Sequence, residues 1–233
     1  MLEELLRAGL AELELAFDET SLRRFRLYYD YLQEQNRQMN LTAIQGEDEV
    51  ARLHFLDCAA LLRFLPPACS SVIDVGSGAG FPGMVLKILR PSLPLTLLDS
   101  LDKRVGFLTR TGELLQLQEL NCLHRRAEEP GSLREQFDAA VSRALARLDL
   151  LAELCLPYVK PGGMFLAMKG PAAEEELAQA QDAIRLLGGR VEDIARYAVP
   201  GTDRQHCVVC VRKERPTPPQ YPRRWAQMKK QPL

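Results

Sequence analysis

The sequence predicts an α/β fold, in which a mostly parallel open sheet ends in an antiparallel hairpin and is preceded by a helical cap. Two observations carry this prediction. From residue 71 onward, apolar runs of strand length alternate with segments of helix length, the pattern of a doubly wound sheet. Two further strand-like runs, 191–199 and 206–212, are too close in sequence for a crossover helix, so they must pair antiparallel.

The helical cap is expected over residues 1–66. Apolar residues at steps of three and four predict a first helix that ends near Asp18 and a second helix capped by Thr20 or Ser21. A third helix is expected over 47–65. We expect these helices to pack on the edge of the sheet and the whole chain to form one structural domain.

The core is expected over residues 67–214. Its predicted strands lie near 71–75, 95–99, 120–125, 137–142 and 163–169. Its predicted helices lie near 82–90, 101–117, 148–159 and 172–187.

The composition limits the class of protein. With 233 residues and 46% hydrophobic content, the chain can bury the core of one α/β domain. The net charge of −1 gives no global attraction to nucleic acid, so any basic surface must be local. Six cysteines without a disulfide spacing, and no apolar run long enough to span a bilayer, lead us to expect a cytoplasmic protein that contacts no membrane. We also expect a monomer that holds no metal.

A glycine-rich turn follows the first predicted strand. An apolar run ends near Asp74, and Gly76, Gly78 and Gly80 follow at alternate positions before Pro82 and the next helix. Glycines allow a positive φ and let a ligand approach the backbone, while the N–H groups of the helix start face the crevice. A ligand is therefore expected at the carboxyl end of this strand.

The identity of that ligand is less constrained. The pattern Gly78-Ala-Gly80-Phe-Pro-Gly83 also matches the dinucleotide fingerprint, which leaves NAD as an alternative. Two acids favour S-adenosylmethionine. Asp74 could hold a ligand ammonium, directly or through water, whereas a pyrophosphate would be repelled there. Asp99, at the end of the next strand, could accept from ribose hydroxyls, although it suits both ligands.

The last residues change in character. From Arg212 to the end there are seven basic residues and one acid, with aromatic residues and prolines between them. We expect this tail, 215–233, to form no regular helix or strand and to contact single-stranded nucleic acid through cations and stacking. A solvated tail is the alternative. The expected RNA-binding residues are Arg223, Arg224, Trp225, Lys229 and Lys230.

Several blocks together resemble one family. They are Asn40-Leu-Thr42, His54-Phe-Leu-Asp57, Asp74 to Gly83, Leu97 to Arg104, Ser142-Arg-Ala144, Met168-Lys-Gly170 and Tyr221-Pro-Arg-Arg224. In this order and spacing they are similar to the bacterial glucose-inhibited division protein B family of small-subunit ribosomal RNA guanine-N7 methyltransferases. Cys58 and Trp225 stand where that family more often has serine and proline.

The resemblance implies a class I methyltransferase fold, S-adenosylmethionine as methyl donor, and a guanine in the decoding-region loop of 16S rRNA as acceptor. The expected partner is 16S rRNA, the small ribosomal subunit or an assembly intermediate. Position by position, the resemblance implies donor contacts at Gly76, Phe81, Ala127-Glu128 and Arg143. With Asp74, Gly78 and Asp99 from the turn analysis, these residues form the predicted donor site.

The chemistry of this acceptor needs no general base, because N7 of neutral guanine already carries a lone pair. Positioning can supply most of the acceleration. Arg143, after the fourth strand, is the predicted reader of the guanine edge, and Lys169, at the end of the fifth, is predicted to steer a phosphate. For both residues the alternative is a solvated or ion-paired surface side chain.

Three other residues are assigned structural roles. His54 lies in a helical stripe and is expected to be a hydrogen-bonded packing residue. Cys207 and Cys210 should point to opposite faces of a strand, which argues against a zinc or redox pair. Two rival functions remain open: a class I methyltransferase with another acceptor, and a non-catalytic RNA-binding or ribosome-assembly module.

Overall fold

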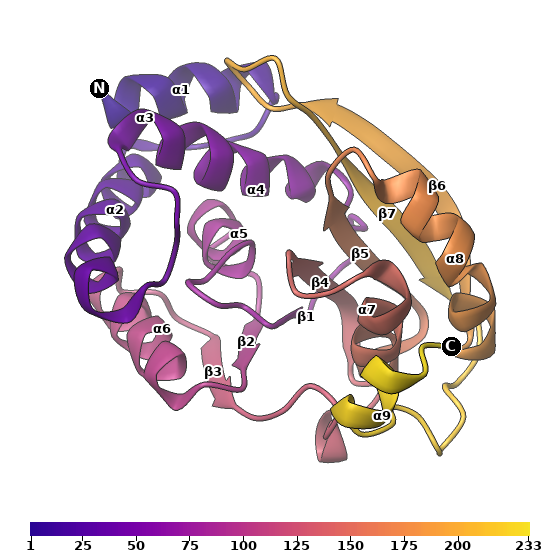
Figure 1. Cartoon of the computed structure of the whole chain (residues 1–233). Coiled ribbons are helices and arrows are strands. Elements are labelled where there is room, and N and C mark those ends of the chain that lie inside the picture. Colours follow the sequence, from indigo (N-terminus) through magenta and orange to yellow (C-terminus); the bar gives the residue numbers. More distant parts are fainter.

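A seven-stranded sheet organises the computed structural model, which describes all residues from Met1 to Leu233. The strand order is β3-β2-β1-β4-β5-β7-β6, and only β7 runs antiparallel to its neighbours (Figure 1). The strands are β1 Val72–Val75, β2 Leu95–Asp99, β3 Leu120–His124, β4 Phe137–Arg143, β5 Val159–Lys169, β6 Gly189–Ala198 and β7 Gln205–Lys213. The predicted mixed sheet with a C-terminal hairpin is confirmed.

Helices cover both faces of the sheet. The helices that follow β1 and β2 pack on one face, and those that follow β4 and β5 pack on the other, as the two separate apolar clusters show. These helices are α5 Gly83–Leu89, α6 Asp102–Leu114, α7 Leu148–Cys155 and α8 Ala173–Leu186. Connections therefore leave β1 and β4 in opposite directions, which opens a crevice at the carboxyl ends of these two strands.

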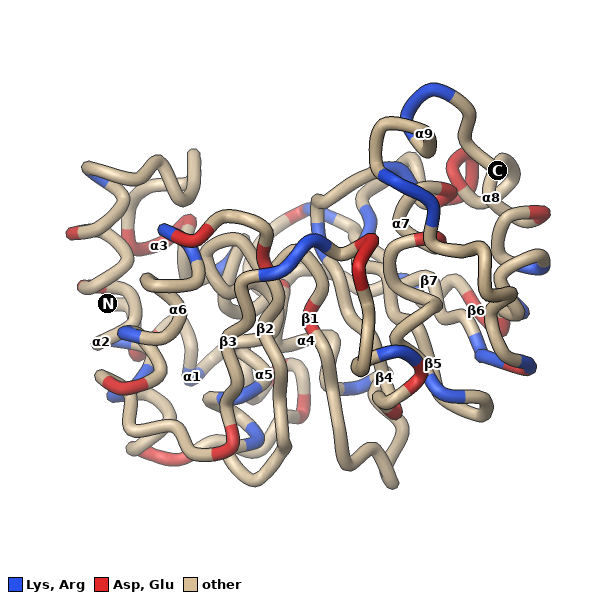
Figure 2. Tube along the Cα trace, turned by 90° about the horizontal axis from the view of Figure 1, so that it is seen from below, with Lys and Arg blue, Asp and Glu red and all other residues tan.

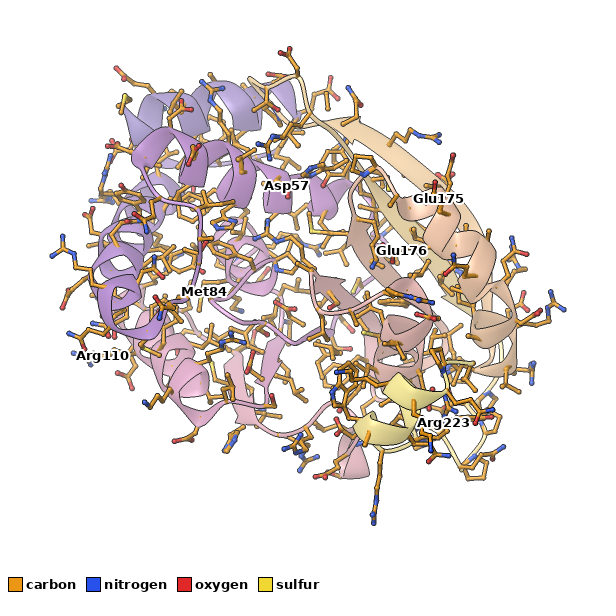
Figure 3. The ribbon with its side chains drawn as sticks, in the orientation of Figure 1. Asp57, Met84, Arg110, Glu175, Glu176 and Arg223 are labelled. Atoms are coloured by element: carbon orange, nitrogen blue, oxygen red, sulfur yellow. The ribbon has the colours of Figure 1, made fainter.

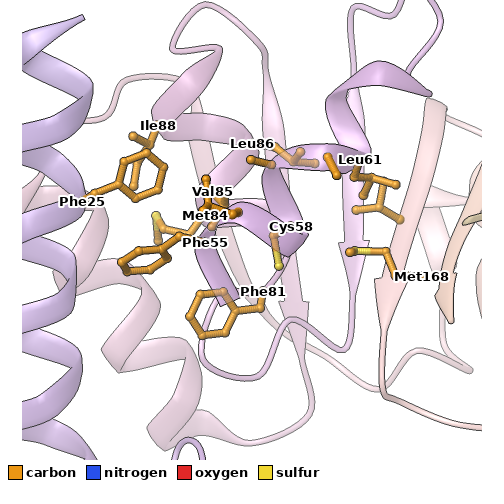
Figure 4. Packing of buried hydrophobic residues seen from close by; sticks show 14 of the residues in the cluster. Phe25, Phe55, Cys58, Leu61, Phe81, Met84, Val85, Leu86, Ile88 and Met168 are labelled. Atoms are coloured by element: carbon orange, nitrogen blue, oxygen red, sulfur yellow. The ribbon is translucent and has the colours of Figure 1, made fainter. Parts of the chain in front are cut away.

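The N-terminal helices complete the first face. They are α1 Leu2–Glu12, α2 Glu19–Met39 and a continuous helical segment from Glu47 to Arg63, which contains α3 Glu47–Val50, a π-helical stretch Ala51–Leu56 and α4 Asp57–Ala60. Their apolar side chains join those of α5 and of the sheet in one cluster (Figure 4). The cap thus covers a face of the sheet, and our prediction that it packs on the edge was wrong, because its leucine stripe needs a broad apolar surface.

The boundary between the first two helices also differs from the prediction. The first helix ends at Glu12, and Asp18 caps the second: its Oδ1 accepts from the N–H of Ser21 at 2.7 Å, while Ser21 Oγ accepts from the N–H of Asp18 at 3.0 Å. This reciprocal pair is a capping box. The cap residue is therefore Asp18 rather than Thr20 or Ser21.

Alternation along the strands separates the two apolar clusters. In β7, Val208 and Cys210 face the cap side, whereas Cys207, Val209 and Val211 face α7 and α8. The two cysteines lie on opposite faces, as predicted. None of the helices is long and apolar enough to cross a membrane.

Candidate functional site

The turn after β1 requires its glycines. Gly76, Gly78 and Gly80 have φ values of +75°, +58° and +97°, in the left-handed region that residues other than glycine rarely adopt. A Cβ at Gly80 would lie 2.7 Å from Tyr28 Oη, and one at Gly83 would lie 2.8 Å from Asp74 Oδ2. Tyr28 itself donates to the carbonyl of Ala79, so the cap holds the turn in place.

Asp74 lies beneath this turn. Its side chain is fully buried, and Oδ2 accepts from the N–H of Gly83 at 2.8 Å, while Oδ1 has no protein partner. Burial raises the pKa of Asp74 to about 7 against the effect of the Gly83 hydrogen bond. A contact between Asp74 and a ligand, direct or through water, stays a prediction; the carboxyl group has no exposed surface, and its Oδ2 faces the start of α5.

A cavity of 230 Å³ opens beside the turn, which we call the β1–β2 cavity. Four of the predicted donor residues line it together: Gly76, Asp99, Ala127 and Glu128. Asp99 is held in place because its oxygens accept from the N–H groups of Gly78 and Leu101, each at 2.9 Å. Gly78 does not line this cavity itself, but its N–H orients Asp99, which does.

The segment after β3 gives this cavity its polar edge. The Glu128 side chain is 13% exposed, and Arg126 Nη1 is 3.9 Å from its Oε1. The carbonyl of Ala127 accepts from Tyr158 Oη at 2.9 Å, which fixes the backbone here. Two strand ends and this loop thus place carboxylates from different elements around one small cavity.

A larger cavity of 550 Å³ lies at the ends of β4 and β5, which we call the β4–β5 cavity. Its lining includes Arg143, Arg147, Lys169 and Arg204, so it is rich in cations. Leu145 lines both cavities. A Cβ at Gly76 would lie 2.7 Å from a methyl carbon of Leu145, so this side chain packs directly against the glycine turn.

Arg143 reaches from β4 into the cap. Nη1 donates to the carbonyl of Leu53 at 3.0 Å and to Asp57 Oδ2 at 3.2 Å, and Nη2 lies 2.7 Å from His54 Nδ1. The guanidinium carbon also lies 5.1 Å from the ring centroid of Phe81. Arg143 is therefore a fixed side chain with a defined orientation, unlike a solvated surface arginine.

Asp57 is the centre of this network, although no role was predicted for it from the sequence. Its Oδ1 accepts from Tyr197 Oη at 2.7 Å and lies 2.8 Å from His206 Nδ1. Burial alone would raise the pKa of Asp57, but the His206 hydrogen bond and the charge of Arg143 outweigh it and lower the pKa. The family-like block that ends in Asp57 was the available signal. His206 carried no such signal, since it joins the site only through the β6–β7 hairpin.

His54 is a packed, neutral residue, which agrees with the predicted hydrogen-bonded packing role. Its ring stacks on Phe81 with centroids 4.2 Å apart, and its Nε2 lies 2.7 Å from Thr42 Oγ1. Burial and the positive charge of Arg143 lower the pKa of His54 to about 3. Since Nδ1 accepts from Arg143, the proton sits on Nε2, which donates to Thr42. The predicted donor residue Phe81 therefore turns its ring toward the cap.

Lys169 fixes the loop that carries Leu145. Its Nζ donates to the carbonyl of Ala146 and to Glu176 Oε2, both at 2.7 Å, and Glu176 Oε2 also accepts from the N–H of Leu148 at 2.8 Å. Figure 3 shows Glu176 on α8 and Asp57 on the helical segment of the cap, and both residues line the β4–β5 cavity. Lys169 thus braces the wall of the β4–β5 cavity.

The C-terminal tail is docked against α7, and it contains a helix, α9 Trp225–Lys230. Our prediction that its prolines exclude a regular helix was wrong, because they flank this segment. Arg223, which we predicted to bind RNA, forms an ion pair within the protein: its Nε and Nη2 donate to Glu153 at 2.8 and 2.6 Å. Glu153 is 1% exposed, so this pair is an anchor for the tail.

The other tail residues divide into two groups. Arg224, Lys229 and Lys230 are exposed and form no ion pair, as expected of phosphate-binding cations. Figure 2 shows the basic residues of the tail beside α9. Trp225 instead lines the β1–β2 cavity.

Comparisons with known proteins agree with this geometry. A family described as rRNA small subunit methyltransferase G matches residues 21–207. Proteins named ribosomal RNA small subunit methyltransferase G are similar over nearly full length: one from Clostridium botulinum (strain Loch Maree / Type A3) is 42% identical over 98% of each chain, and one from Lachnoclostridium phytofermentans is 43% identical over 97% of this chain and 95% of that one.

Solved structures show the fold. TrmN from Thermus thermophilus has a TM-score of 0.56 at 18% identity, with 76% of this chain and 53% of that chain covered. A geranyl diphosphate methyltransferase in complex with SAM has a TM-score of 0.55 at 12% identity, with 74% and 92% covered. The sheet is thus that of class I methyltransferases, and by its sequence the chain belongs to the rRNA small subunit methyltransferase G family.

Proposed function

We propose that the protein transfers a methyl group from S-adenosylmethionine to N7 of a guanine in bacterial 16S rRNA. One observation carries this proposal: the β1–β2 cavity, with its carboxylates, and the β4–β5 cavity, with its cations, share Leu145 as a wall. Two ligands bound in these cavities would therefore meet at the crevice between β1 and β4. This is the arrangement that a two-substrate group transfer needs.

The β1–β2 cavity suits an adenosine. Each Asp99 oxygen accepts one backbone N–H and retains a lone pair for a ribose hydroxyl. The Glu128 carboxylate is available to the amino group of adenine. Bound S-adenosylmethionine would supply an electrophilic methyl carbon on a sulfonium sulfur. The turn glycines would admit it close to the backbone.

The β4–β5 cavity suits a guanine. After its three contacts, Arg143 retains the N–H of Nε and one N–H of Nη2 without a protein acceptor. Arginine is the commonest partner of the O6 and N7 edge of guanine. Here Arg143 would hold O6 while the cap fixes its orientation, which leaves N7 free to face the donor.

The polar groups of this cavity are arranged for positioning rather than for removing a proton. His54 is neutral, and both its ring nitrogens have partners. Asp57 accepts from Arg143, His206 and Tyr197, and Glu176 is paired with Lys169. N7 methylation transfers no proton, because the lone pair of N7 forms the new bond and the positive charge passes to the purine. The arrangement matches that chemistry.

We propose 16S rRNA, presented on the small ribosomal subunit or an assembly intermediate, as the substrate, with the reaction in the cytoplasm. The relatives are named as small-subunit rRNA methyltransferases. The exposed cations Arg224, Lys229 and Lys230 lie on the tail that borders the β1–β2 cavity. They would hold phosphates of the strand from which the guanine is extruded.

The test is methyl transfer from labelled donor to 30S subunits of a strain that lacks this modification, followed by mapping of the labelled base. We expect one N7-methylguanine, and Asp99→Ala should abolish labelling at low donor concentration. Asp102→Ala is the matched control, because this exposed carboxylate lies three residues further on. Label on a protein or small molecule would favour another acceptor, and absence of donor binding in calorimetry would favour a non-catalytic RNA-binding module.

A further inference from the structure

The wall of the β1–β2 cavity contains one residue from the C-terminal tail, Trp225. Most of that cavity is built from the ends of β1 and β2 and the segment after β3, all expected from the fold. The tail residue is a separate contribution, from about a hundred residues or more further along the chain than Glu128 or Asp99. Trp225 was predicted from the sequence to contact RNA, so its position calls for a different role.

The tail is anchored on both sides of Trp225. Two residues before it, Arg223 makes a bidentate pair with the buried Glu153, and its Nη1 donates to the carbonyl of Gln231 at 3.0 Å. Three residues after it, Met228 is fully buried in the cluster under α7. Residues three apart on a helix share a face, so burial of Met228 directs Trp225 toward the same side.

Further contacts hold the chain that leads to this helix. Arg134, in the loop between β3 and β4, donates to the carbonyls of Thr217 and Tyr221, each at 2.7 Å. Figure 1 shows α9 between α7 and the segment that follows β3. The indole is therefore held at the cavity by the two elements that carry its other walls, Leu154 on α7 and Ala127-Glu128 after β3.

We propose that Trp225 is a donor-binding residue, which packs against the adenosine of S-adenosylmethionine, and that the tail closes this end of the donor site. An indole offers a flat apolar surface to a purine, while Glu128 offers an acceptor for its amino group. Any base can stack on an aromatic side chain, and this stacking contributes substantially to the free energy of binding. This inference rests on the proposed function for the identity of the ligand.

The chain offers a direct readout, because it contains a single tryptophan. Titration of the full-length protein with S-adenosylhomocysteine, with excitation selective for tryptophan, should change the emission of Trp225. The change should saturate, and the dissociation constant fitted to it should equal the one found by calorimetry. Trp225→Ala should weaken donor binding about tenfold to a hundredfold, and Trp225→Phe only a few-fold. Gln227→Ala is the matched control, because this exposed side chain lies on the same helix, and its donor affinity should equal that of the wild type.

Two results would overturn the inference: unchanged emission at saturation, or a Trp225→Ala protein that binds donor as tightly as the wild type. The emission experiment needs no variant, so it holds even where Trp225→Ala loosens the tail. No RNA is present, so either result leaves the identity of the acceptor untouched. A wild-type protein that binds no donor in calorimetry would instead remove the proposed function, and the inference with it.

Discussion

The two cavities differ in how the chain builds them. The β1–β2 cavity is built around a backbone turn of glycines and loops after consecutive strands, with Asp99 at the end of the strand that neighbours β1. The β4–β5 cavity depends on side chains that meet from distant segments, since Asp57 contacts residues 86 to 149 positions away. We therefore expect the first cavity to tolerate substitutions outside the turn, and the second to be disrupted when one charged side chain of the network is removed.

The largest effect that follows from this contrast is expected for Asp57→Ala. It leaves Arg143 buried without its carboxylate, and losing one member of a buried pair costs about 3–5 kcal/mol of unfolding free energy. Glu113→Ala, which removes the exposed partner of Arg110, should cost less than about 1 kcal/mol. Urea unfolding measures both. Equal losses would show that the network adds no more stability than a surface pair.

Arg143→Lys tests the same network through activity. A lysine cannot reproduce the contacts to Leu53, Asp57 and His54 at once, so the guanine would be misplaced. We expect kcat/KM on 30S subunits to fall about a hundredfold, with donor affinity within a few-fold of the wild type. Arg110→Lys on the surface of α6 is the control. A comparable fall in donor affinity would mean that the two cavities are not separable.

Gly80→Ala tests the backbone-built cavity. The left-handed φ and the proximity of Tyr28 Oη should lower the free energy of unfolding by about 1–2 kcal/mol and weaken donor binding. Gly106→Ala lies within α6 with open space around it and should instead stabilise by about 0.4–1 kcal/mol. Thermal unfolding and calorimetry report both properties. Stabilisation by both substitutions would remove the argument for a strained turn.

A smaller effect is expected when cations of the C-terminal tail are removed. The double variant Lys229→Ala/Lys230→Ala should reduce the salt dependence of 30S binding by a slope of about two, with donor affinity unchanged. Lys160→Ala is the control, because Lys160 lies near the start of β5, away from the cavities. A slope that stays the same in the double variant would show that the tail cations do not contact phosphate.

The smallest expected effect is that of pH on the chemical step. His54 has a folded pKa of about 3, below its value near 6.5 in an unfolded chain, so its contribution to stability is lost as pH falls below about 6.5. His54 therefore stays neutral near pH 7, whereas Asp74, with a pKa of about 7, titrates but does not line the β4–β5 cavity. With saturating donor, single-turnover methylation should still vary by less than about threefold between roughly pH 6 and pH 8, because N7 gives up no proton. A tenfold rise per pH unit would require a general base.

The same contrast explains how much the sequence could predict. The strands, the hairpin, the glycine turn and Asp99 are local patterns, so periodicity and spacing were enough to find them. The site position of Arg143 was predicted from its place at the end of a strand and from the resemblance to the family. The roles of Asp57, His206 and Glu176 depend on contacts between segments that only the folded chain brings together. RNA binding by Arg223 stays a prediction, and its pair with the buried Glu153 could not be inferred from the composition of the tail.

Leu145 gives the two ligands a common boundary, and thermodynamic reciprocity follows from it. If a bound donor presses on this side chain and so alters the affinity for RNA by some factor, bound RNA must alter the affinity for the donor by the same factor. The demethylated product would lack the transferred methyl group, so we expect its coupling to RNA affinity to differ from that of the donor. The shared side chain of Leu145 is the place where such coupling would act.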